Sequence, residues 1–408
     1  MFDKIKKNLG KLKKNWKKKV LKNRTRYSMR DVLLFITITF SFGIFVGGLI
    51  MYKTGMLGSN ASLYEFVSTY NEILDSYYED VDSEKLLQAG ISGMIGYLGD
   101  PYTVYMNKDT ADSFNEDVEG YYSGIGAEVK YDALFEKVSL GNIYENSPAE
   151  KAGLKTDDVL IKVNGEEISG KTLSYIADKV KGEEGTDVTL TIMRNDEQLD
   201  IKVTRGHVDT ISVSGKVIEK EERKIGYLSL SVFAANTDEQ FKKELKKLED
   251  EKIDSLIIDV RGNSGGYLTT VSEIVNLFTK KGEIIYQLKT KDKIEKVKDD
   301  TNDFREYPLV VLADAHSASA SELLTGALKE TYHATVVGTK TFGKGKVQKM
   351  RVLSNGAMFK YTNQEWLTPE GNYIDGQGIE PDVEIKYTYS KDEVDNQLDK
   401  AIEVLLEK

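Results

Sequence analysis

The sequence contains no cysteine and only three histidines among its 408 residues, and these two shortages exclude several kinds of site. Without cysteine there are no disulfides, no thiol nucleophile and no cysteine-ligated zinc or iron–sulfur cluster. The histidines are His207, His316 and His333, and none of them begins an HExxH pattern. A zinc protease is therefore not expected, and the sequence predicts neither a metal site nor a cofactor.

Acidic residues outnumber basic ones, but the two signs are unevenly distributed along the chain. Residues 1–30 hold 13 of the 56 Lys and Arg residues against one acidic residue, Asp3, so the rest of the chain has a net charge of −22. A nucleic-acid-binding protein would carry a positive patch on its folded domain, so binding to nucleic acid is not expected. The length suits two or three domains of roughly 150 residues each.

Residues 32–52 (VLLFITITFSFGIFVGGLIMY) form a run of 21 residues without a charge. As a helix, such a run crosses the roughly 30 Å hydrocarbon core of a membrane. A cleaved signal peptide is the alternative, but its apolar region has about 7–15 residues, and the sequence after this run matches a cleavage site poorly. Because positive charge stays inside, we expect a cytoplasmic tail at 1–31, a transmembrane helix at 32–52 and a single-pass cell-membrane protein whose later residues are all extracytoplasmic.

Residues 60–118 and 119–206 differ in their hydrophobic pattern. Apolar residues at helical spacing predict amphipathic helices over 62–79 and 83–98, and such a pair must pack on a neighbouring domain or on another subunit to cover its apolar faces. Residues 119–206 instead show short β-rich runs around two short helices, the first of which opens with the capping box Ser147-Pro148-Ala149-Glu150. One small β-rich domain is predicted there.

Residues 207–385 alternate strand-like runs with helices, which predicts an α/β core. The run LIIDV at 256–260 is apolar almost throughout, as expected of a strand that is buried on both faces. Helices are predicted near 267–280 and from about 319 to 330. Residues 386–408 follow as a charged helix with one apolar stripe.

Two segments of this core bring serine and glycine to turns where backbone N–H groups could act. SASASE at 317–322 lies at a strand-to-helix turn, and Ser319 with Glu322 forms a capping box, which would be a purely structural role. Alternatively, Ser319 is a nucleophile, and the N–H of Ala320 beside it is an oxyanion donor. The turn RGNSGG is either an ordinary glycine turn or the source of a second such donor, the N–H of Gly265.

The segment GTKTFGKGKVQ at 338–348 also allows two interpretations. Its Gly-x4-Gly-Lys344 pattern is similar to a phosphate loop, but the next residue is Gly345, which has no hydroxyl for Mg²⁺, so nucleotide hydrolysis is disfavoured. As a general base, Lys344 would have to be neutral, and at a pKa of about 10.4 only about 4 in 10,000 lysines are neutral at pH 7. Burial lowers that pKa. Gln348 either orients the amine or is an ordinary polar strand residue.

These motifs resemble those of the carboxy-terminal processing (tail-specific) serine proteases, from about residue 62 to residue 385. Seven segments carry the resemblance, and they occur in the order that the family has them: LLQAGISGMIGYLGDPYTVYM at 86–106, YYSGIGAEV at 121–129, SPAEKAGLKTDDVLIKVNG at 147–165, LIIDVRGNSGGYL at 256–268, SASASELLTGALKE at 317–330, TFGKGKVQ at 341–348 and WLTPEGNYIDGQGIEPDV at 366–383. One segment alone would be weak support, whereas seven in order are highly specific.

The resemblance implies a mixed α/β protein with a PDZ domain at 119–206 and a serine protease core at 207–385 that is similar to the crotonase and Clp protease folds. It implies that Ser319 is the nucleophile and Lys344 the base, with Gln348 completing a Ser-Lys-Gln arrangement. The oxyanion donors would be the two N–H groups named above, at Gly265 and Ala320.

The resemblance also implies partners. The family's carboxylate-binding loop of the PDZ domain corresponds to Tyr122, Ser123, Gly124, Ile125 and Gly126, where successive N–H groups receive the C-terminus of a protein or peptide. Peptide binding there would switch proteolysis on. As in relatives, a homodimer formed through the segment 60–118 and the helix at 386–408 is expected.

The sequence departs from the family pattern at two positions. Ser264 stands where many relatives have proline, which leaves the backbone donors possible. Lys181 stands where relatives often have arginine, and lysine cannot make the bidentate contacts of arginine, so this departure concerns the gating by the PDZ domain and not the chemistry. The rival interpretation is a binding module with a degenerate core, and the intact serine, lysine and glutamine argue against it.

Overall fold

The computed structural model describes residues 29–53, 61–132, 137–389 and 394–408. The chain divides into two compact units, Met1–Gly90 and Ile91–Lys408. The predicted cytoplasmic tail lies, as far as residue 28, outside the described residues.

The first unit contains the apolar run that the sequence singled out. Helix α2 (Met29–Lys53) includes it, and the stretch Val32–Leu49 is long and apolar enough to cross a membrane. A core helix of a soluble protein would be mostly buried, but none of this stretch is buried within the structure. A signal sequence meets the same criteria of length and composition.

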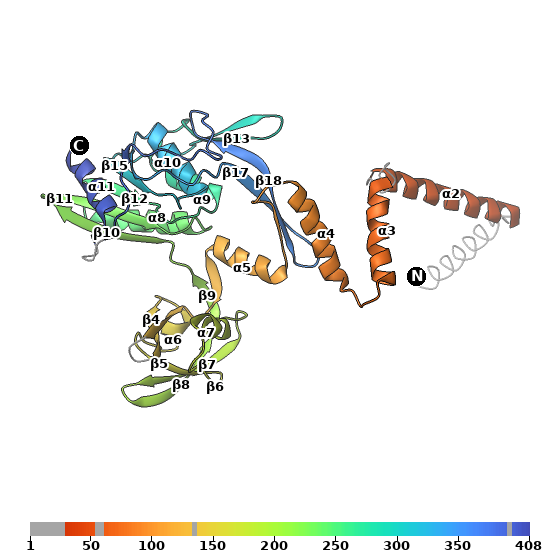
Figure 1. Ribbon diagram of the computed structural model, residues 1–408, viewed down its shortest axis with the longest axis horizontal. Helices are drawn as coiled ribbons and strands as arrows, with labels where there is room; N and C mark the ends of the chain where they lie inside the picture. Colours follow the sequence, from red (N-terminus) through yellow and green to blue (C-terminus); the bar gives the residue numbers. More distant parts are fainter. Residues whose placement is uncertain (1–28, 54–60, 133–136, 390–393) are drawn as a thin grey trace, which may run out of the picture. The chain divides into compact units, whose positions relative to one another are not determined.

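Two further helices match the predicted amphipathic pair. They are α3 (Ala61–Ser76) and α4 (Ser83–Tyr97), labelled in Figure 1, and α4 begins in the first unit and ends in the second. Large apolar side chains on α3 are exposed, among them Leu63, Phe66 and Val67. The predicted need for a covering partner therefore remains for this helix.

The second unit begins with a small β-rich domain at the predicted place. Its sheet has the strand order β3-β4-β5-β7-β8, with β6 paired to β5. The strands are β3 (Ala127–Asp132), β4 (Lys137–Ile143), β5 (Val159–Val163), β6 (Glu166–Glu167), β7 (Asp187–Arg194) and β8 (Glu197–Thr204). Strands β2 (Tyr121–Gly124) and β9 (Gly206–Asp209) pair antiparallel and join the two ends of the domain.

Two short helices of this domain begin at the capping residues that the sequence contains. Helix α6 (Pro148–Lys151) follows Ser147, whose Oγ accepts the N–H of Glu150, and the Glu150 carboxylate accepts the N–H of Asn146. Helix α7 (Leu173–Val180) follows Thr172, which caps it in the same way. Capping by side-chain oxygens satisfies N–H groups that a helix leaves unpaired at its start.

A six-stranded sheet forms the centre of the remaining residues, as the strand–helix alternation predicts. Its strand order is β10-β11-β12-β15-β16-β19, and all neighbours except β10 and β11 are parallel. The strands are β10 (Val213–Lys220), β11 (Arg223–Leu230), β12 (Ser255–Asp259), β15 (Leu309–Ala313), β16 (Thr335–Gly338) and β19 (Val383–Glu384).

Helices cover both faces of this sheet, so its central strands are buried on both sides. Leu256 and Ile258 of β12 belong to the large core that includes α8 (Thr237–Asp250), α9 (Leu268–Val275) and α10 (Ala320–Thr331). Ile257, between them, belongs to a second core beneath α11 (Asn396–Leu406). The prediction that LIIDV is a strand buried on both faces is confirmed, whereas α9 is shorter than the predicted helix.

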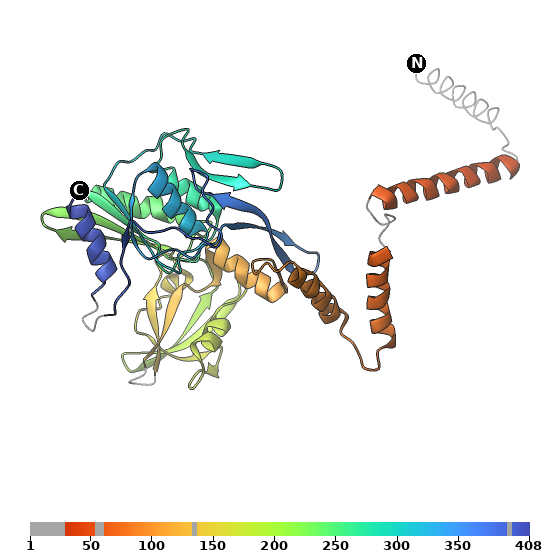
Figure 2. The ribbon, with the colours of Figure 1, turned by 45° about the horizontal axis from the view of Figure 1, so that its top comes forward.

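A second sheet completes the core, and its strand β17 begins two residues after Lys344. Its strands are β1 (Val104–Met106), β13 (Ile284–Lys289), β14 (Ile294–Lys298), β17 (Lys346–Val352) and β18 (Met358–Leu367), and α5 (Lys108–Glu119) follows β1. The order is β1-β18-β13-β14, and β17 also pairs with β18. The long strands β17 and β18 lie side by side in both views (Figure 1, Figure 2).

Candidate active site

Ser319 occupies the turn that connects β15 to the start of α10. Its backbone has φ 55° and ψ −111°, a left-handed conformation that L residues other than glycine rarely adopt. Such strain costs about 1–3 kcal/mol and persists only where the surroundings enforce it. Here Asn263 O accepts the N–H of Ala318, and Val260 O accepts the hydroxyl of Ser317. A serine on a tight strand-to-helix turn presents its Oγ outward at the end of the sheet.

Glu322 joins this turn to the loop that carries Lys344. The side chain is fully buried, and its two oxygens accept four hydrogen bonds. The donors are Ser319 N at 2.8 Å, Thr341 Oγ1 at 2.6 Å, Gly343 N at 2.7 Å and Lys344 N at 2.8 Å. The capping interaction predicted for Glu322 is present, but three of its four contacts are to a distant segment that the sequence analysis did not connect with it.

A hydrogen bond holds the backbone of Lys344, and its side chain is partly buried. Its carbonyl accepts the indole N–H of Trp366 at 3.0 Å, and its Nζ lies 4.7 Å from the centroid of the Tyr102 ring. Burial lowers the pKa of the Lys344 amine, and the positive charge of Lys360 lowers it further, whereas the carboxylate of Glu322 acts in the opposite direction. A lowered pKa raises the fraction of neutral amine at pH 7.

One cavity of about 500 Å³ is lined by Ser319, Lys344, Gln348 and Gly265. The structure therefore brings together four of the five residues for which the sequence suggested a catalytic or oxyanion role. Gln348 donates from Nε2 to Thr362 Oγ1 at 3.2 Å. In the part of the chain that the structure describes, no hydrogen bond joins Ser319 Oγ to Lys344 Nζ.

The glycine turn packs directly against the serine turn. A Cβ on Gly265, which has φ 111°, would lie 2.9 Å from Ala318 O and 3.1 Å from Ala320 N, so no larger residue fits there. The N–H of Gly265 donates to Asn263 Oδ1 at 2.9 Å. The N–H of Ala320 donates no hydrogen bond within the described residues. Of the two predicted oxyanion donors, Ala320 is available and Gly265 is occupied by Asn263.

The β-rich domain has a groove of its own between β3 and α7. Of the five residues predicted to receive a peptide C-terminus, Tyr122 and Ile125 line this groove of about 320 Å³. Burial raises the pKa of the Tyr122 hydroxyl to about 12. Lys181 lines the groove as well: its Nζ lies 5.0 Å from the centroid of the Tyr122 ring and 3.6 Å from Glu116 of α5. Ser123, Gly124 and Gly126 do not line the groove.

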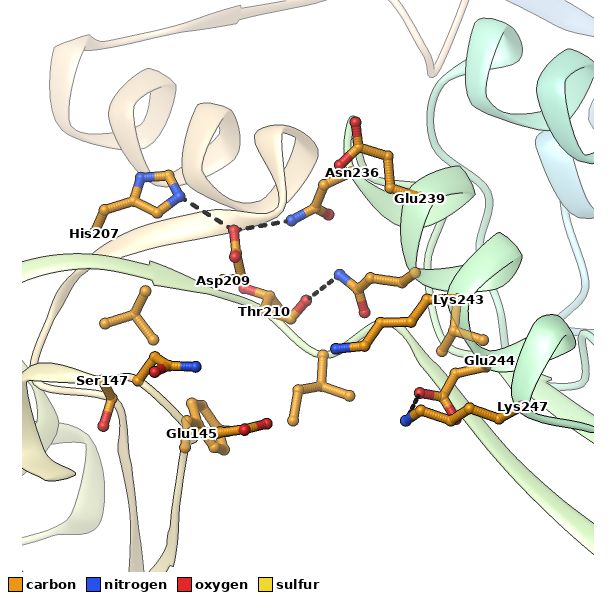
Figure 3. Close-up of a pocket in the computed structure, with 16 residues that line it drawn as sticks. Glu145, Ser147, His207, Asp209, Thr210, Asn236, Glu239, Lys243, Glu244 and Lys247 are labelled. Atoms are coloured by element: carbon orange, nitrogen blue, oxygen red, sulfur yellow. Dashed lines mark hydrogen bonds and ion pairs between the residues drawn. The ribbon is translucent and has the colours of Figure 1, made fainter. Parts of the chain in front are cut away.

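A larger pocket, of about 720 Å³, lies away from these residues and contains none of the predicted catalytic groups. Figure 3 shows Asp209 accepting a hydrogen bond from Asn236 and pairing with His207. Gln240 donates to the Thr210 carbonyl. Size therefore does not identify the site of chemistry. Among the described residues, no three His, Asp or Glu side chains come together as ligands for a metal ion.

Three family models match the chain: "Peptidase family S41" at residues 224–385, "Activating protease CtpB N-terminal domain" at 52–110 and "PDZ domain" at 141–194. These matches fall on the α/β core, the predicted helical segment and the β-rich domain.

Curated relatives agree with the family models. "Carboxy-terminal processing protease CtpB" of Bacillus subtilis (strain 168) is 41% identical over 320 residues, which are 78% of this chain and 66% of that protein. "Probable CtpA-like serine protease" of Staphylococcus aureus (strain N315) is 38% identical over 328 residues, 80% of this chain and 65% of that protein. The alignments thus span just under two thirds of these relatives' own length.

A solved structure named "Putative S41 protease from Bacteroides fragilis NCTC 9343" has the same fold, with a TM-score of 0.50 at 13% identity over 81% of this chain and 91% of that one. The family models and the curated relatives therefore lead to one conclusion: the chain belongs to peptidase family S41, with the N-terminal and PDZ domains of its carboxy-terminal processing members.

Proposed function

We propose that the chain is a membrane-anchored serine endopeptidase of the carboxy-terminal processing type, acting on proteins outside the cytoplasm. The observation that carries the proposal is the shared cavity of Ser319 and Lys344, whose backbones are joined by the buried carboxylate of Glu322. Family membership adds the class of chemistry, because the relatives named above are proteases.

In the proposed reaction Ser319 Oγ attacks the scissile carbonyl while the neutral amine of Lys344 takes the hydroxyl proton. The protonated lysine then donates to the departing amine of the peptide, leaving an acyl-enzyme on Ser319. A water molecule, deprotonated by Lys344 in its turn, hydrolyses the ester and restores the serine. The lowered pKa of Lys344 supports this role, because it leaves more of the amine in the basic form at neutral pH.

The oxyanion of each tetrahedral intermediate would accept hydrogen bonds from backbone N–H groups at the start of α10 and in the glycine turn. The N–H of Ala320 is ready for this task. The N–H of Gly265 takes part only when Asn263 Oδ1 releases or shares it. Binding of substrate would also have to bring Ser319 Oγ and Lys344 Nζ within hydrogen-bond reach, and such contacts often tighten only in the complex.

Gating by the PDZ domain is a further part of the proposal. The groove between β3 and α7 has apolar walls from Ile125, Val129 and Leu173, which suit a peptide that ends in an apolar residue. Lys181 in this groove contacts Glu116 of α5, and α5 also supplies Phe114 to the active-site cavity. A peptide in the groove could therefore shift a helix that borders the catalytic residues.

The membrane anchor and the dimer are also proposals. Helix α2 supports the anchor by its length and exposure. The exposed apolar residues of α3 support pairing of two copies. The C-terminal helix offers less support than the sequence suggested, because Ala401 and Leu405 of α11 are buried against the sheet of their own chain.

The test uses the full chain in detergent micelles with an unfolded protein as substrate, with and without a peptide that has an apolar C-terminal residue. We expect cleavage by the unaltered chain and by Ser214→Ala, which removes an exposed serine far from the site in sequence. Ser319→Ala and Lys344→Ala should each lower kcat by about a thousandfold or more. Stimulation by the peptide would support the gating.

A fluorophosphonate probe provides the second readout, because it acylates an activated serine without requiring the correct substrate. Labelling that disappears in Ser319→Ala assigns the nucleophile even if the chosen protein is not cleaved. Cleavage or labelling that survives in Ser319→Ala would refute the assignment, and an unlabelled chain would favour a scaffold with a binding function.

A further inference from the structure

Three lysines line the cavity that contains Ser319, and they differ in how their charge is balanced. Besides Lys344, they are Lys346 and Lys360. Lys346 Nζ lies 2.7 Å from Glu365 Oε1 and 3.5 Å from Asp375 Oδ2, so its charge is neutralised. Lys360 has no carboxylate within ion-pair distance anywhere in the described ranges.

The position of Lys360 is fixed by the sheet and by an aromatic ring. The residue lies in the middle of the second sheet, on β18, paired with Val104 of β1 on one side and with Met350 of β17 on the other. Its Nζ lies 4.6 Å from the centroid of Phe114 of α5, which also lines the cavity. An ammonium above an aromatic face is attracted to it, but the ring leaves the charge itself uncompensated.

Partial burial of this cation without an anion is unfavourable. The side chain is half-buried, and desolvation lowers the pKa of the Lys360 amine. No Asp or Glu is among the residues that line the cavity. The cavity therefore has an excess of positive charge and no carboxylate of its own with which Lys360 could form an ion pair.

Apolar residues form part of the remaining wall, among them Val232, Leu268 and Met350, and hydroxyl and amide side chains line the rest. Apolar surface next to an ammonium without an ion-pair partner suits a peptide: apolar side chains contact the apolar surface, and one carboxylate meets the cation. An inorganic anion would not use the apolar surface.

We propose that Lys360 forms a subsite that binds one carboxylate of the peptide in the active-site cavity. That carboxylate is either the side chain of Asp or Glu or the C-terminal carboxylate of the peptide. The proposal rests on the proposed function only in that it takes the occupant of this cavity to be the protease substrate.

The experiment measures binding rather than cleavage, so that it does not depend on turnover. Fluorescent peptides are titrated into the full-length Ser319→Ala chain in detergent micelles, and the dissociation constants are obtained from fluorescence anisotropy. One series has a C-terminal amide and carries Gln or Glu at each interior position in turn. The other compares an all-Gln peptide with a free C-terminal carboxylate and the same peptide as its amide.

We expect the added carboxylate to strengthen binding about tenfold in one of the two series, as is usual for a hydrogen bond to a charged group, and that series identifies the source of the carboxylate. The second substitution Lys360→Met should remove the difference, and Lys360→Arg should retain it. Lys349→Met is the matched control, because it removes an exposed lysine of the neighbouring strand β17 and should leave the tenfold ratio intact.

The PDZ groove also suits peptide C-termini and can therefore contribute to the ratio of the dissociation constants without and with the carboxylate. Only the part of this ratio that Lys360→Met removes is evidence for the subsite. A carboxylate preference that is undiminished in Lys360→Met, or no preference in either series, would overturn the proposal. Its outcome is separate from that of the proposed function: if peptides were cleaved equally well by the Ser319→Ala chain, the nucleophile would be wrong, and the Lys360 comparison would still decide the subsite.

Discussion

Lys344 is a residue at which the proposed chemistry and the stability of the fold have opposite requirements. Burial lowers the pKa of its amine, which means that the folded protein holds this proton less tightly than the unfolded chain does. Between the folded pKa and the unfolded value of about 10.4, the unfolded chain binds more protons, so stability rises with pH. At neutral pH the lysine is therefore destabilising.

We predict that Lys344→Met raises the free energy of unfolding at pH 7, by about 1 kcal/mol, as is common when an apolar residue replaces a buried charge, while abolishing catalysis. The gain should shrink as pH approaches 10.4, because both states of the unaltered protein then lose the proton. Thermal unfolding from pH 7 to pH 10.5 measures this. Lys349→Met, on the exposed side of the neighbouring strand, should show no such trend, and destabilisation by Lys344→Met at pH 7 would contradict the account.

At the scale of elements, Glu322 decides how α10 and the loop before β17 are positioned relative to each other. The Glu322 carboxylate is the acceptor in all four of its hydrogen bonds, so a side chain that replaces one oxygen with a donor cannot make all four. In Glu322→Gln the amide nitrogen would face two donors whichever oxygen it replaced, leaving buried donors unpaired at about 1–3 kcal/mol each.

We expect Glu322→Gln to lower the free energy of unfolding by about 2–3 kcal/mol and to lower kcat far more than it changes KM, because Glu322 positions Ser319 and Lys344 without touching substrate. For the carboxylate, Thr341→Val is the milder comparison, since it removes one donor and leaves three; it also removes the acceptor of the Ile379 N–H. Steady-state kinetics together with urea unfolding distinguish the two effects. A Glu322→Gln chain that loses stability but keeps its kcat would refute the positioning role.

The sequence predicted well those elements whose start or burial depends on residues that are neighbours in the chain. The helix after Ser147 begins where its capping box and proline require, and strand β12 is buried on both faces as its apolar run indicates. The contacts of Glu322 with the loop at 341–344 could not be predicted, because a capping box predicts hydrogen bonds only within the first turn of its own helix. Lys360 was missed for a related reason: its place in the cavity depends on the pairing of β18 with β1 and β17, which a single strand does not specify.

The C-terminal helix illustrates the same limit. The apolar stripe predicted at 386–408 exists, but an apolar stripe does not identify its partner. In the structure Leu405 and Ala401 pack on the sheet of the same chain, so these two residues are not free to form the expected dimer.

At the scale of the whole molecule, the uneven distribution of charge and the apolar helix α2 together predict on which side of a membrane each part of the chain lies. Thirteen basic residues precede the apolar run, and the net charge after residue 30 is −22. Basic segments next to a membrane helix stay on the cytoplasmic side, so the active-site cavity would lie outside.

We predict that the full chain, expressed in bacteria, sediments with membranes, withstands alkaline carbonate and is released only by detergent, whereas a chain without residues 32–52 is not membrane-bound. A protease added to spheroplasts should remove a C-terminal tag but leave an N-terminal tag intact, because only the former would be outside. Replacing the basic residues of 1–30 by glutamine, with α2 unchanged, should weaken or reverse this asymmetry.

The signal-peptide alternative makes a different prediction: the N-terminus of the mature protein, read by mass spectrometry, would then lie beyond residue 52, and the chain would leave the membrane fraction.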